Sequence, residues 1–354
     1  MLLYIHIPFC DSKCFYCAFN SYVDLFHLKK EYMKSLRIQL KHELKKIPNQ
    51  KLKSIFFGGG TPSCIDAIYY KDIFKDLEEF ISQNTEITTE ANPNSASIEW
   101  LSQMKSLGVN RVSFGVQSFD DKKLKFLGRN HNHTQAIDAI NNAKKVGFIH
   151  INCDIIYDTA VDTKELIQND LDIIKTLPID HISAYSLTIE EGTKFFDRIN
   201  VQIENEEMTK YIFESLKSNG FTQYEISNFS KNKKARSQHN FGYWEKEDYL
   251  GVGAGAVGCF ENTRYYPKTN VQEYILNPLE YEKEEKLSKE DTKFEKLFLG
   301  LRSAVGVSLD ILSKSEIQKV ELLEKEKKLY IKNNMFYNYD FLITDEIVLF
   351  IEDQ

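Results

Sequence analysis

Three cysteines lie within eight residues near the start of the sequence, in YIHIPFCDSKCFYCAFN (4–20). Cys10, Cys14 and Cys17 form a C-x3-C-x2-C pattern that follows a short apolar run. Three thiolates in one loop can bind three irons of a [4Fe-4S] cluster, and the fourth iron is then free to bind a small molecule. A zinc knuckle is the alternative, but structural zinc sites use four ligands, usually as two separated pairs, and the other three cysteines stand alone.

Composition narrows the class of protein. The 354 residues are 42% hydrophobic and carry a formal charge of -7, which argues against a general nucleic-acid-binding protein. The start of the sequence lacks the features of a secretory signal, so we expect a cytoplasmic protein without structural disulfides. The run of small and apolar residues at 249–260 is shorter than the roughly 20 residues that a membrane-spanning helix needs.

Short apolar runs alternate with amphipathic segments over the first two thirds of the chain. The strands are predicted at 2–9, 54–59, 86–92, 111–117, 151–157 and 181–189. The helices are predicted at 28–46, 68–82, 97–107, 133–146, 163–176 and 205–218. This alternation indicates repeated βαβ units and hence a parallel sheet, either an open doubly wound sheet or a full or partial barrel. In both architectures ligands bind at the carboxyl ends of the strands.

Polar motifs follow four of these strands directly: FC, GGGTPS, EANP and GVQSF. Gln117 is a polar residue in an otherwise apolar strand, which costs free energy unless the side chain has a partner, and a ligand would supply one. Taken singly, these motifs have structural alternatives. GGGTP is compatible with an ordinary turn, Glu90 and Asp154 with solvated strand ends, and Arg129 with a surface ion pair.

The alternation of predicted strands and helices weakens after about residue 220. The charged stretch at 279–291 has the composition of a linker, and the residues beyond it suggest helices followed by a β-hairpin. We therefore divide the chain into a core at 1–225, a connecting region at 226–290 and a smaller α+β domain at 291–354, which has a winged-helix-like order of predicted elements. GAGAVG at 253–258 matches a nucleotide-binding pattern, but no helix is predicted after it.

Six motifs in order carry a family resemblance: YIHIPFC, FFGGGTPS, TEANP, RVSFGVQSFDDKKLKFLGR, HISAYSLTIEEGT and QHNFGYW. Together they resemble the coproporphyrinogen III oxidase-like branch of the radical S-adenosylmethionine (SAM) superfamily, in particular the HemW-type heme chaperones. The resemblance covers nearly the whole chain. It implies a partial (β/α)6 parallel barrel with a [4Fe-4S] cluster on Cys10, Cys14 and Cys17, whose open iron binds the amino and carboxylate groups of SAM.

The resemblance also implies which residues contact SAM. Gly59, Gly60 and Thr61 would let the backbone approach its amino end. Glu90 and Gln117 would bind ribose hydroxyls or polar ends, and Arg129 would bind the carboxylate. The remaining members of this predicted site are Tyr4, Tyr16 and Asp154.

HNFGYW (239–244) resembles a motif associated with heme in the HemW type. The His239 imidazole could be an axial iron ligand, and Tyr243 and Trp244 offer flat apolar faces to a macrocycle. The alternative is a hydrogen-bonded histidine that packs beside aromatic residues. His6, on the first strand, is open to three roles: ligand, SAM-site residue or core residue.

The resemblance predicts a heme chaperone that passes heme to an acceptor protein, such as a respiratory enzyme. The alternatives are an oxygen-independent coproporphyrinogen III oxidase, a dehydrogenase of porphyrin biosynthesis, or a radical enzyme on another substrate. Related oxidases have an N-terminal arm and a fourth cysteine, where this chain has Phe19. Two departures from the HemW type are Val257 in place of a histidine, and YDTAVDT (157–163) in place of a Gly-Leu-Pro-Gly turn. Homodimerisation and peripheral membrane contact stay open.

Overall fold

The computed structural model describes residues 1–352, in which one large sheet forms the core. Its strand order is β12-β11-β10-β9-β1-β2-β3-β4-β5-β6-β8-β7. The six predicted strands are all present and run parallel to one another. They are β1 (Leu2–Ile7), β2 (Ser54–Gly59), β3 (Glu86–Ala91), β4 (Arg111–Gln117), β5 (His150–Tyr157) and β6 (His181–Ser186).

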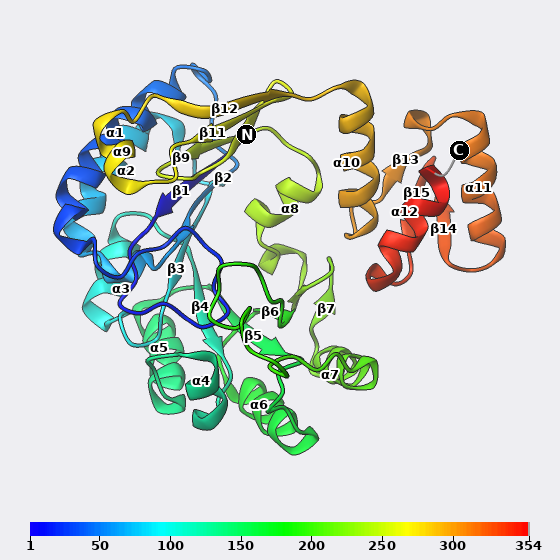
Figure 1. Ribbon diagram of the computed structural model, residues 1–354, viewed down its shortest axis with the longest axis horizontal. Coiled ribbons are helices and arrows are strands. Elements are labelled where there is room, and N and C mark those ends of the chain that lie inside the picture. Colours follow the sequence, from blue (N-terminus) through cyan, green and yellow to red (C-terminus); the bar gives the residue numbers. More distant parts are fainter. Residues whose placement is uncertain (353–354) are drawn as a thin grey trace.

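Helices cover the outer face of this curved sheet, as expected of a partial (β/α)6 barrel (Figure 1). They are α1 (Lys29–Leu44), α2 (Lys71–Leu77), α3 (Ile98–Ser106), α4 (Asp121–Leu127), α5 (His133–Val146), α6 (Lys164–Thr176) and α7 (Glu206–Ser218). Local sequence fixes their ends. In α5 the Asn132 side chain accepts a hydrogen bond from the Gln135 backbone in a capping box, and Gly147, at φ +97°, ends the helix in the left-handed conformation.

Short 3-10 turns occur at η1 (Phe26–Leu28), η2 (Pro62–Cys64), η3 (Ala67–Tyr70), η4 (Glu78–Phe80), η5 (Lys233–Ala235), η6 (Leu309–Ile311) and η7 (Phe341–Ile343). Those at η3 and η4 flank α2, so the α-helix is shorter than the predicted 68–82. The apolar spacing therefore marks the whole buried segment rather than its regular helical part.

Residues 222–286 extend the same sheet at both edges. The strands β7 (Thr222–Gln223) and β8 (Asn228–Ser230) follow β6, while β9 (Tyr249–Val252) runs parallel to β1. Beyond β9 lie β10 (Gly258–Phe260), β11 (Thr263–Pro267) and β12 (Tyr281–Lys286), with α8 (Gln238–Trp244) and α9 (Val271–Leu276) between strands. The strand β10 begins at Gly258, at the end of the glycine-rich turn, so this turn does not lead into a helix as a nucleotide-binding loop does.

The prediction of a linker at 279–291 was wrong. Residues 281–286 form the edge strand β12, which pairs antiparallel with β11, and α10 (Lys289–Leu301) begins three residues later. Most side chains of β12 are exposed, so the strand has the charged composition of a linker. Charged side chains are also a common protection of sheet edges.

The C-terminal unit has its own hydrophobic core, built on Leu297, Leu301, Val320, Phe336 and Ile347. Its elements are α10, β13 (Val307–Ser308), α11 (Lys314–Lys325), β14 (Leu329–Lys332), β15 (Met335–Asn338) and α12 (Thr344–Glu352). The predicted helices and hairpin are present, and the order is compatible with a winged-helix-like unit. The helix α12 after the hairpin was not predicted. In Figure 1, α10 lies beside α8, and the other elements of this unit lie on the far side of α10.

Candidate functional site

A cavity of about 390 Å³ opens at the carboxyl ends of the parallel strands, where ligands bind in this class of fold. We call it the carboxyl-end cavity. It brings together eleven of the residues predicted for the cluster and for SAM. They are Cys10, Cys14, Tyr16, Cys17, Gly59, Gly60, Thr61, Glu90, Gln117, Arg129 and Asp154.

The cysteine loop after β1 is held in place by backbone hydrogen bonds. The Cys10 amide donates to the Tyr22 carbonyl at 3.0 Å, and the Phe15 amide donates to the Leu127 carbonyl at 3.0 Å. Lys13 adds a side-chain bond to the Phe19 carbonyl at 2.7 Å. The Cys10 and Lys13 bonds therefore close the loop on itself, and the Phe15 bond fixes its middle to the end of α4.

The donor set fits an iron–sulfur cluster better than a single metal ion. All three thiols line one cavity, yet within residues 1–352 no three His, Cys, Asp or Glu side chains converge on one ion position. Cysteines of a [4Fe-4S] cluster bind different irons, so their sulfurs need not converge. Burial raises the pKa of Cys10 and of Cys17, so these thiols are neutral until a metal displaces their protons.

Gln117, the last residue of β4, is the clearest sign of a ligand site. Its backbone adopts φ +71°, which is uncommon for a side chain other than glycine, and the pairing of β4 with β5 is irregular there. The side chain is 8% exposed, and its Oε1 atom has no hydrogen-bond partner within the part of the chain that the structure describes. A strained backbone beside a cavity, together with a buried amide oxygen that lacks a protein partner, is an arrangement found at ligand sites.

Two carboxyl groups face the same cavity. Burial, together with the neighbouring Asp154, raises the pKa of Glu90 to about 8, and burial raises that of Asp154 to about 6. Asp154 accepts a hydrogen bond from Asn152 at 2.6 Å, and Glu90 accepts one from the Gly59 amide at 3.1 Å. Near neutral pH, Glu90 is thus largely protonated while Asp154 is ionised, which gives the site one donor and one acceptor for polar groups of a ligand.

Arg129 is half-buried, and its guanidinium group already donates hydrogen bonds to several protein groups. One terminal nitrogen donates to the Cys14 sulfur at 3.2 Å, and the other donates to Asn92 Oδ1 at 2.7 Å and to the Gly115 carbonyl. Its Nε atom has no partner in residues 1–352. A bidentate contact with a ligand carboxylate would therefore replace one of these protein contacts.

The glycine-containing segment at the end of β2 packs closely against β1, and its backbone amides donate hydrogen bonds to protein carbonyls. The Gly60 amide donates to the Ile7 carbonyl, and the Thr61 amide donates to the Phe9 carbonyl, both at 2.8 Å. A side chain on Gly59 would meet the His6 ring at 2.3 Å, and Gly59 also has φ +107°. This loop lies against β1 because these positions have no side chains, which brings it into the wall of the cavity.

Tyr4 and His6 do not line the carboxyl-end cavity. The Tyr4 hydroxyl lies 3.0 Å from His6 Nδ1, and His6 Nε2 lies 2.8 Å from the Asn20 carbonyl. Because a carbonyl only accepts, Nε2 carries the proton and Nδ1 accepts from Tyr4. Burial lowers the pKa of His6 to about 4, so it is a neutral core histidine that supports the cysteine loop.

The predicted heme residue His239 lies in α8 and is 1% exposed. Both of its ring nitrogens have partners: Nδ1 is 2.8 Å from the Ser54 hydroxyl and Nε2 is 3.0 Å from the Tyr243 hydroxyl. The ring stacks on Phe56 at 5.0 Å, and Trp244, half-buried, ends the helix. This geometry matches the packing alternative, and neither His239 nor Tyr243 lines the carboxyl-end cavity.

Comparison with known proteins identifies the family. A model of the radical SAM superfamily matches residues 4–173. The heme chaperone HemW of Lactococcus lactis subsp. lactis (strain IL1403) is 35% identical over 318 residues, which cover 87% of this chain and 83% of that protein. The chain belongs to the HemW family. The heme chaperone HemW of Bacillus subtilis (strain 168) is 34% identical over 86% of this chain and 84% of its own length.

The fold of this HemW family member is also that of a solved structure. The coproporphyrinogen III oxidase HemN from Escherichia coli superposes with a TM-score of 0.85 over 99% of this chain and 90% of that one. The two sequences are 18% identical, so this likeness concerns the fold. No helix among residues 1–352 is long and apolar enough to span a membrane.

The loop at 157–163, which departs from the family pattern, is ordered by carboxylates. Asp158 adopts φ +63°, which aspartate tolerates better than most residues, and accepts hydrogen bonds from the Ser186 hydroxyl and the Asn205 amide. Asp162 accepts from the Thr159 amide at 2.8 Å. Because Ser186 lines the carboxyl-end cavity, the loop supports one wall of the HemW-type site.

Sequence reasoning missed three polar residues of this site. Asn92, in TEANP, joins Arg129 to Thr61, and Asn152 holds Asp154. Tyr185 lines the cavity from the end of β6 and is 40% exposed. Asn92 and Tyr185 lie in motifs that mark the family, and Asn152 precedes Asp154 by two positions on the same face of β5, so the period of a strand could have pointed to it.

Proposed function

We propose that this protein is a heme chaperone of the HemW type, which binds heme and transfers it to an acceptor protein. Relatives that match most of the chain at about 35% identity carry that name, and this supports the proposal. The observation that supports the cofactor part is the carboxyl-end cavity, which is lined by all three thiols and by Gln117, whose backbone is strained and whose amide oxygen has no partner among residues 1–352.

In this proposal Cys10, Cys14 and Cys17 hold a [4Fe-4S] cluster, and SAM occupies the rest of the cavity. The cluster, when bound, supplies an open iron for the amino and carboxylate groups of SAM and a source of single electrons. The protein residues position SAM by polar contacts. Gln117 presents its free amide oxygen, and Glu90 and Asp154 present a donor and an acceptor to its hydroxyls.

Heme binding at α8 is the second part of the proposal. Coordination by His239 needs one ring nitrogen to leave its hydroxyl partner, Ser54 or Tyr243, and the ring to emerge from its stack on Phe56. Heme binding by His239 is therefore coupled to opening of α8. Tyr243 and Trp244, on the same helix, would then offer aromatic faces to the macrocycle.

The test is an anaerobic heme titration of cluster-reconstituted protein, followed by its absorption spectrum, for the wild type, His239→Ala and His150→Ala. His150 is a half-buried histidine on β5 whose partner is Asp180, so it is a matched control. We expect one heme per chain, weaker binding after loss of His239, and no change after loss of His150. Equal binding by all three would place heme elsewhere, and absence of binding would refute the chaperone proposal.

A parallel assay separates this proposal from the oxidase alternative. The reconstituted protein is incubated with SAM, a reductant and coproporphyrinogen III, and the porphyrin products are analysed. We expect no protoporphyrinogen, because Phe19, which lines the carboxyl-end cavity, stands where the oxidases have a further cysteine. Formation of protoporphyrinogen would assign the protein to the oxidases.

A further inference from the structure

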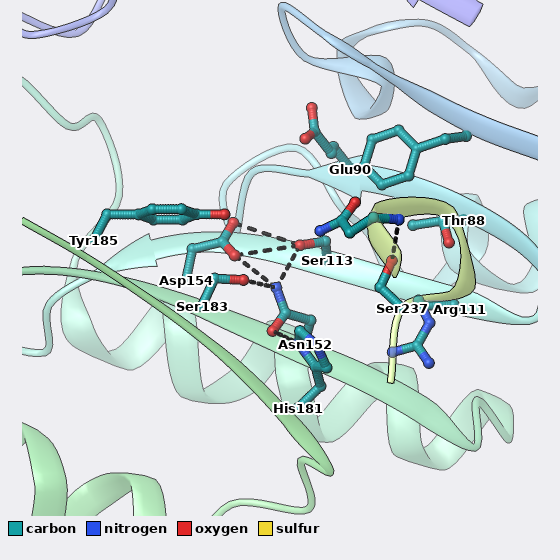
Figure 2. Close-up of a pocket in the computed structure, with 12 residues that line it drawn as sticks. Thr88, Glu90, Arg111, Ser113, Asn152, Asp154, His181, Ser183, Tyr185 and Ser237 are labelled. Carbon is teal, nitrogen blue, oxygen red and sulfur yellow. Dashed lines mark hydrogen bonds between the residues drawn. The ribbon is translucent and has the colours of Figure 1, made fainter. Parts of the chain in front are cut away.

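A second cavity lies inside the barrel, next to the carboxyl-end cavity. It has a volume of about 150 Å³ and is lined mostly by polar side chains of β3 to β6 and of the start of α8 (Figure 2). We call it the barrel-core cavity. Glu90, Asp154 and Tyr185 line both cavities, so they separate the predicted SAM site from the interior. At the far end lie Ser237 and Asn240 of the α8 segment.

Hydrogen bonds between buried side chains connect the two ends of this cavity. Asn152 Nδ2 donates to Asp154 Oδ1 at 2.6 Å, and Asn152 Oδ1 lies 2.6 Å from His181 Nδ1. His181 Nε2 lies 2.7 Å from the Tyr224 hydroxyl, which accepts from the Ser237 amide at 3.1 Å. Figure 2 shows the first part of this chain, from Asp154 through Asn152 to His181.

The direction of each hydrogen bond follows from its neighbours. The ionised Asp154 carboxylate only accepts, so the amide nitrogen of Asn152 faces it and the amide oxygen faces His181. His181 Nδ1 must then carry the proton. Burial lowers the pKa of His181 well below its usual value, so the ring is neutral and its Nε2 accepts from the Tyr224 hydroxyl. With the proton on Nδ1 of His181, every hydrogen bond from Asp154 to Tyr224 therefore has one donor and one acceptor.

The chain ends at the residue that begins α8. Ser237 is the N-cap of this helix, and its side chain accepts from the Asn240 amide at 3.3 Å. The same segment is held from the barrel by Arg111, which donates to the carbonyls of Ala235 and Arg236. Because Asn152, His181, Ser183 and Ser237 face a polar cavity, hydrogen bonds rather than apolar packing fix their positions.

We propose that Asn152, His181 and Tyr224 are positioning residues, which hold the Asp154 carboxylate and tie it to the start of α8, so that SAM binding and order in α8 favour each other. This rests on the proposed function, in which Asp154 contacts SAM. Coupling between two sites is reciprocal. A ligand that requires α8 to open will therefore weaken SAM binding by the same factor by which SAM weakens the binding of that ligand. Heme coordinated by His239 is such a ligand.

The first experiment measures SAM affinity of the full-length, cluster-reconstituted protein with three variants. His181→Leu removes both hydrogen bonds, and we expect SAM affinity to fall about fivefold or more. His181→Asn places an amide donor near the position of Nδ1, so it restores the bond to Asn152 and should bind SAM within about twofold of the wild type. His150→Asn, on β5 but bonded to Asp180, should not change affinity.

The second experiment follows hydrogen exchange of residues 237–244 with and without SAM. In the wild type SAM should slow exchange of these amides. Tyr224→Phe keeps the ring but cuts the chain between His181 and Ser237, so SAM should still bind while exchange in α8 no longer responds to it. This variant keeps the test valid if His181→Leu does not fold, which circular dichroism will show.

The possible results distinguish a failure of the proposed SAM site from a failure of the proposed coupling between this site and α8. If the wild type binds no SAM, the proposed SAM site is refuted and the inference with it. If the wild type binds SAM but His181→Leu binds equally well, or α8 exchange in the wild type ignores SAM, the inference alone is overturned. Reduced affinity in His181→Leu that His181→Asn does not rescue also overturns it, because the loss is then a packing effect.

Discussion

The carboxyl-end cavity and the α8 motif both carry family-specific residues, but they differ in how far their polar atoms are satisfied. In the cavity, Gln117 Oε1 and Arg129 Nε have no partner among residues 1–352. In α8, both ring nitrogens of His239 have hydroxyl partners, and its amide donates to Glu86 at 3.2 Å. A buried atom without a partner can form a hydrogen bond to a ligand without losing a protein contact, whereas a fully bonded side chain must first give up protein contacts.

The largest effect should come from the cysteine loop. Replacing Cys14 by serine removes one thiolate ligand and should abolish formation of a stable [4Fe-4S] cluster, seen as loss of the broad absorbance near 400 nm and of the iron content. Cys64→Ser is the control, since Cys64 does not line the carboxyl-end cavity. Equal iron content in the two variants would show that Cys14 contributes no more to cluster binding than a cysteine outside this cavity.

His239→Ala should affect the protein even without heme. It deletes a fully buried ring and leaves the Ser54 and Tyr243 hydroxyls unpaired, which should lower the free energy of unfolding by about 2–4 kcal/mol. Tyr243→Phe, which removes one hydroxyl, should cost only about 1 kcal/mol. Urea denaturation of the heme-free protein measures both. An unchanged stability in His239→Ala would mean that α8 is already open.

Gln117→Gly separates ligand binding from stability. Glycine adopts φ +71° more easily than glutamine, so the variant should be as stable as the wild type or slightly more stable. It lacks the unpaired amide oxygen, and SAM affinity should fall about tenfold. Thermal unfolding and anaerobic titration give the two numbers. A variant that loses stability but keeps SAM affinity would show that Gln117 is a structural residue.

A further effect concerns the pH dependence of stability. Glu90 has a pKa of about 8 in the native protein against 4.5 without its surroundings, so the native state binds the proton more tightly and stability of the SAM-free protein falls as pH rises between these values. Glu90→Gln stays neutral and should lessen this fall, measured by urea denaturation at pH 5.5 and 8. Glu99→Gln, on the exposed face of α3, is the control. If stability depended on pH in the same way in all three proteins, Glu90 would not be the group with the raised pKa.

Much of the barrel follows from the sequence because its strands are short apolar runs with polar motifs at their ends. β4 was predicted with the observed boundaries, and so was α5. The edge strand β12 was missed because its side chains are charged and exposed, and its pairing with β11 is a tertiary property. The pattern of apolar residues in a sequence indicates which side chains are buried. An edge strand such as β12 buries few side chains, so this pattern does not reveal it.

Many members of the candidate site were predictable, but their contacts were not. Eleven of the residues that line the carboxyl-end cavity were named from motifs. That Gly60 and Thr61 use their amides on β1, or that Arg129 bonds to Cys14, depends on how separate loops meet in space. His239 illustrates the limit most clearly, since the motif that contains it is compatible with a ligand and with a packing residue.

The central claim is that the carboxyl-end cavity holds SAM against an iron–sulfur cluster on Cys10, Cys14 and Cys17. The most direct test is electron paramagnetic resonance of the reduced, anaerobically reconstituted protein, with and without SAM, for the wild type and Gln117→Gly. We expect a cluster signal that SAM shifts in the wild type at a concentration that leaves the variant unshifted. A cluster signal that SAM does not alter in the wild type would contradict it.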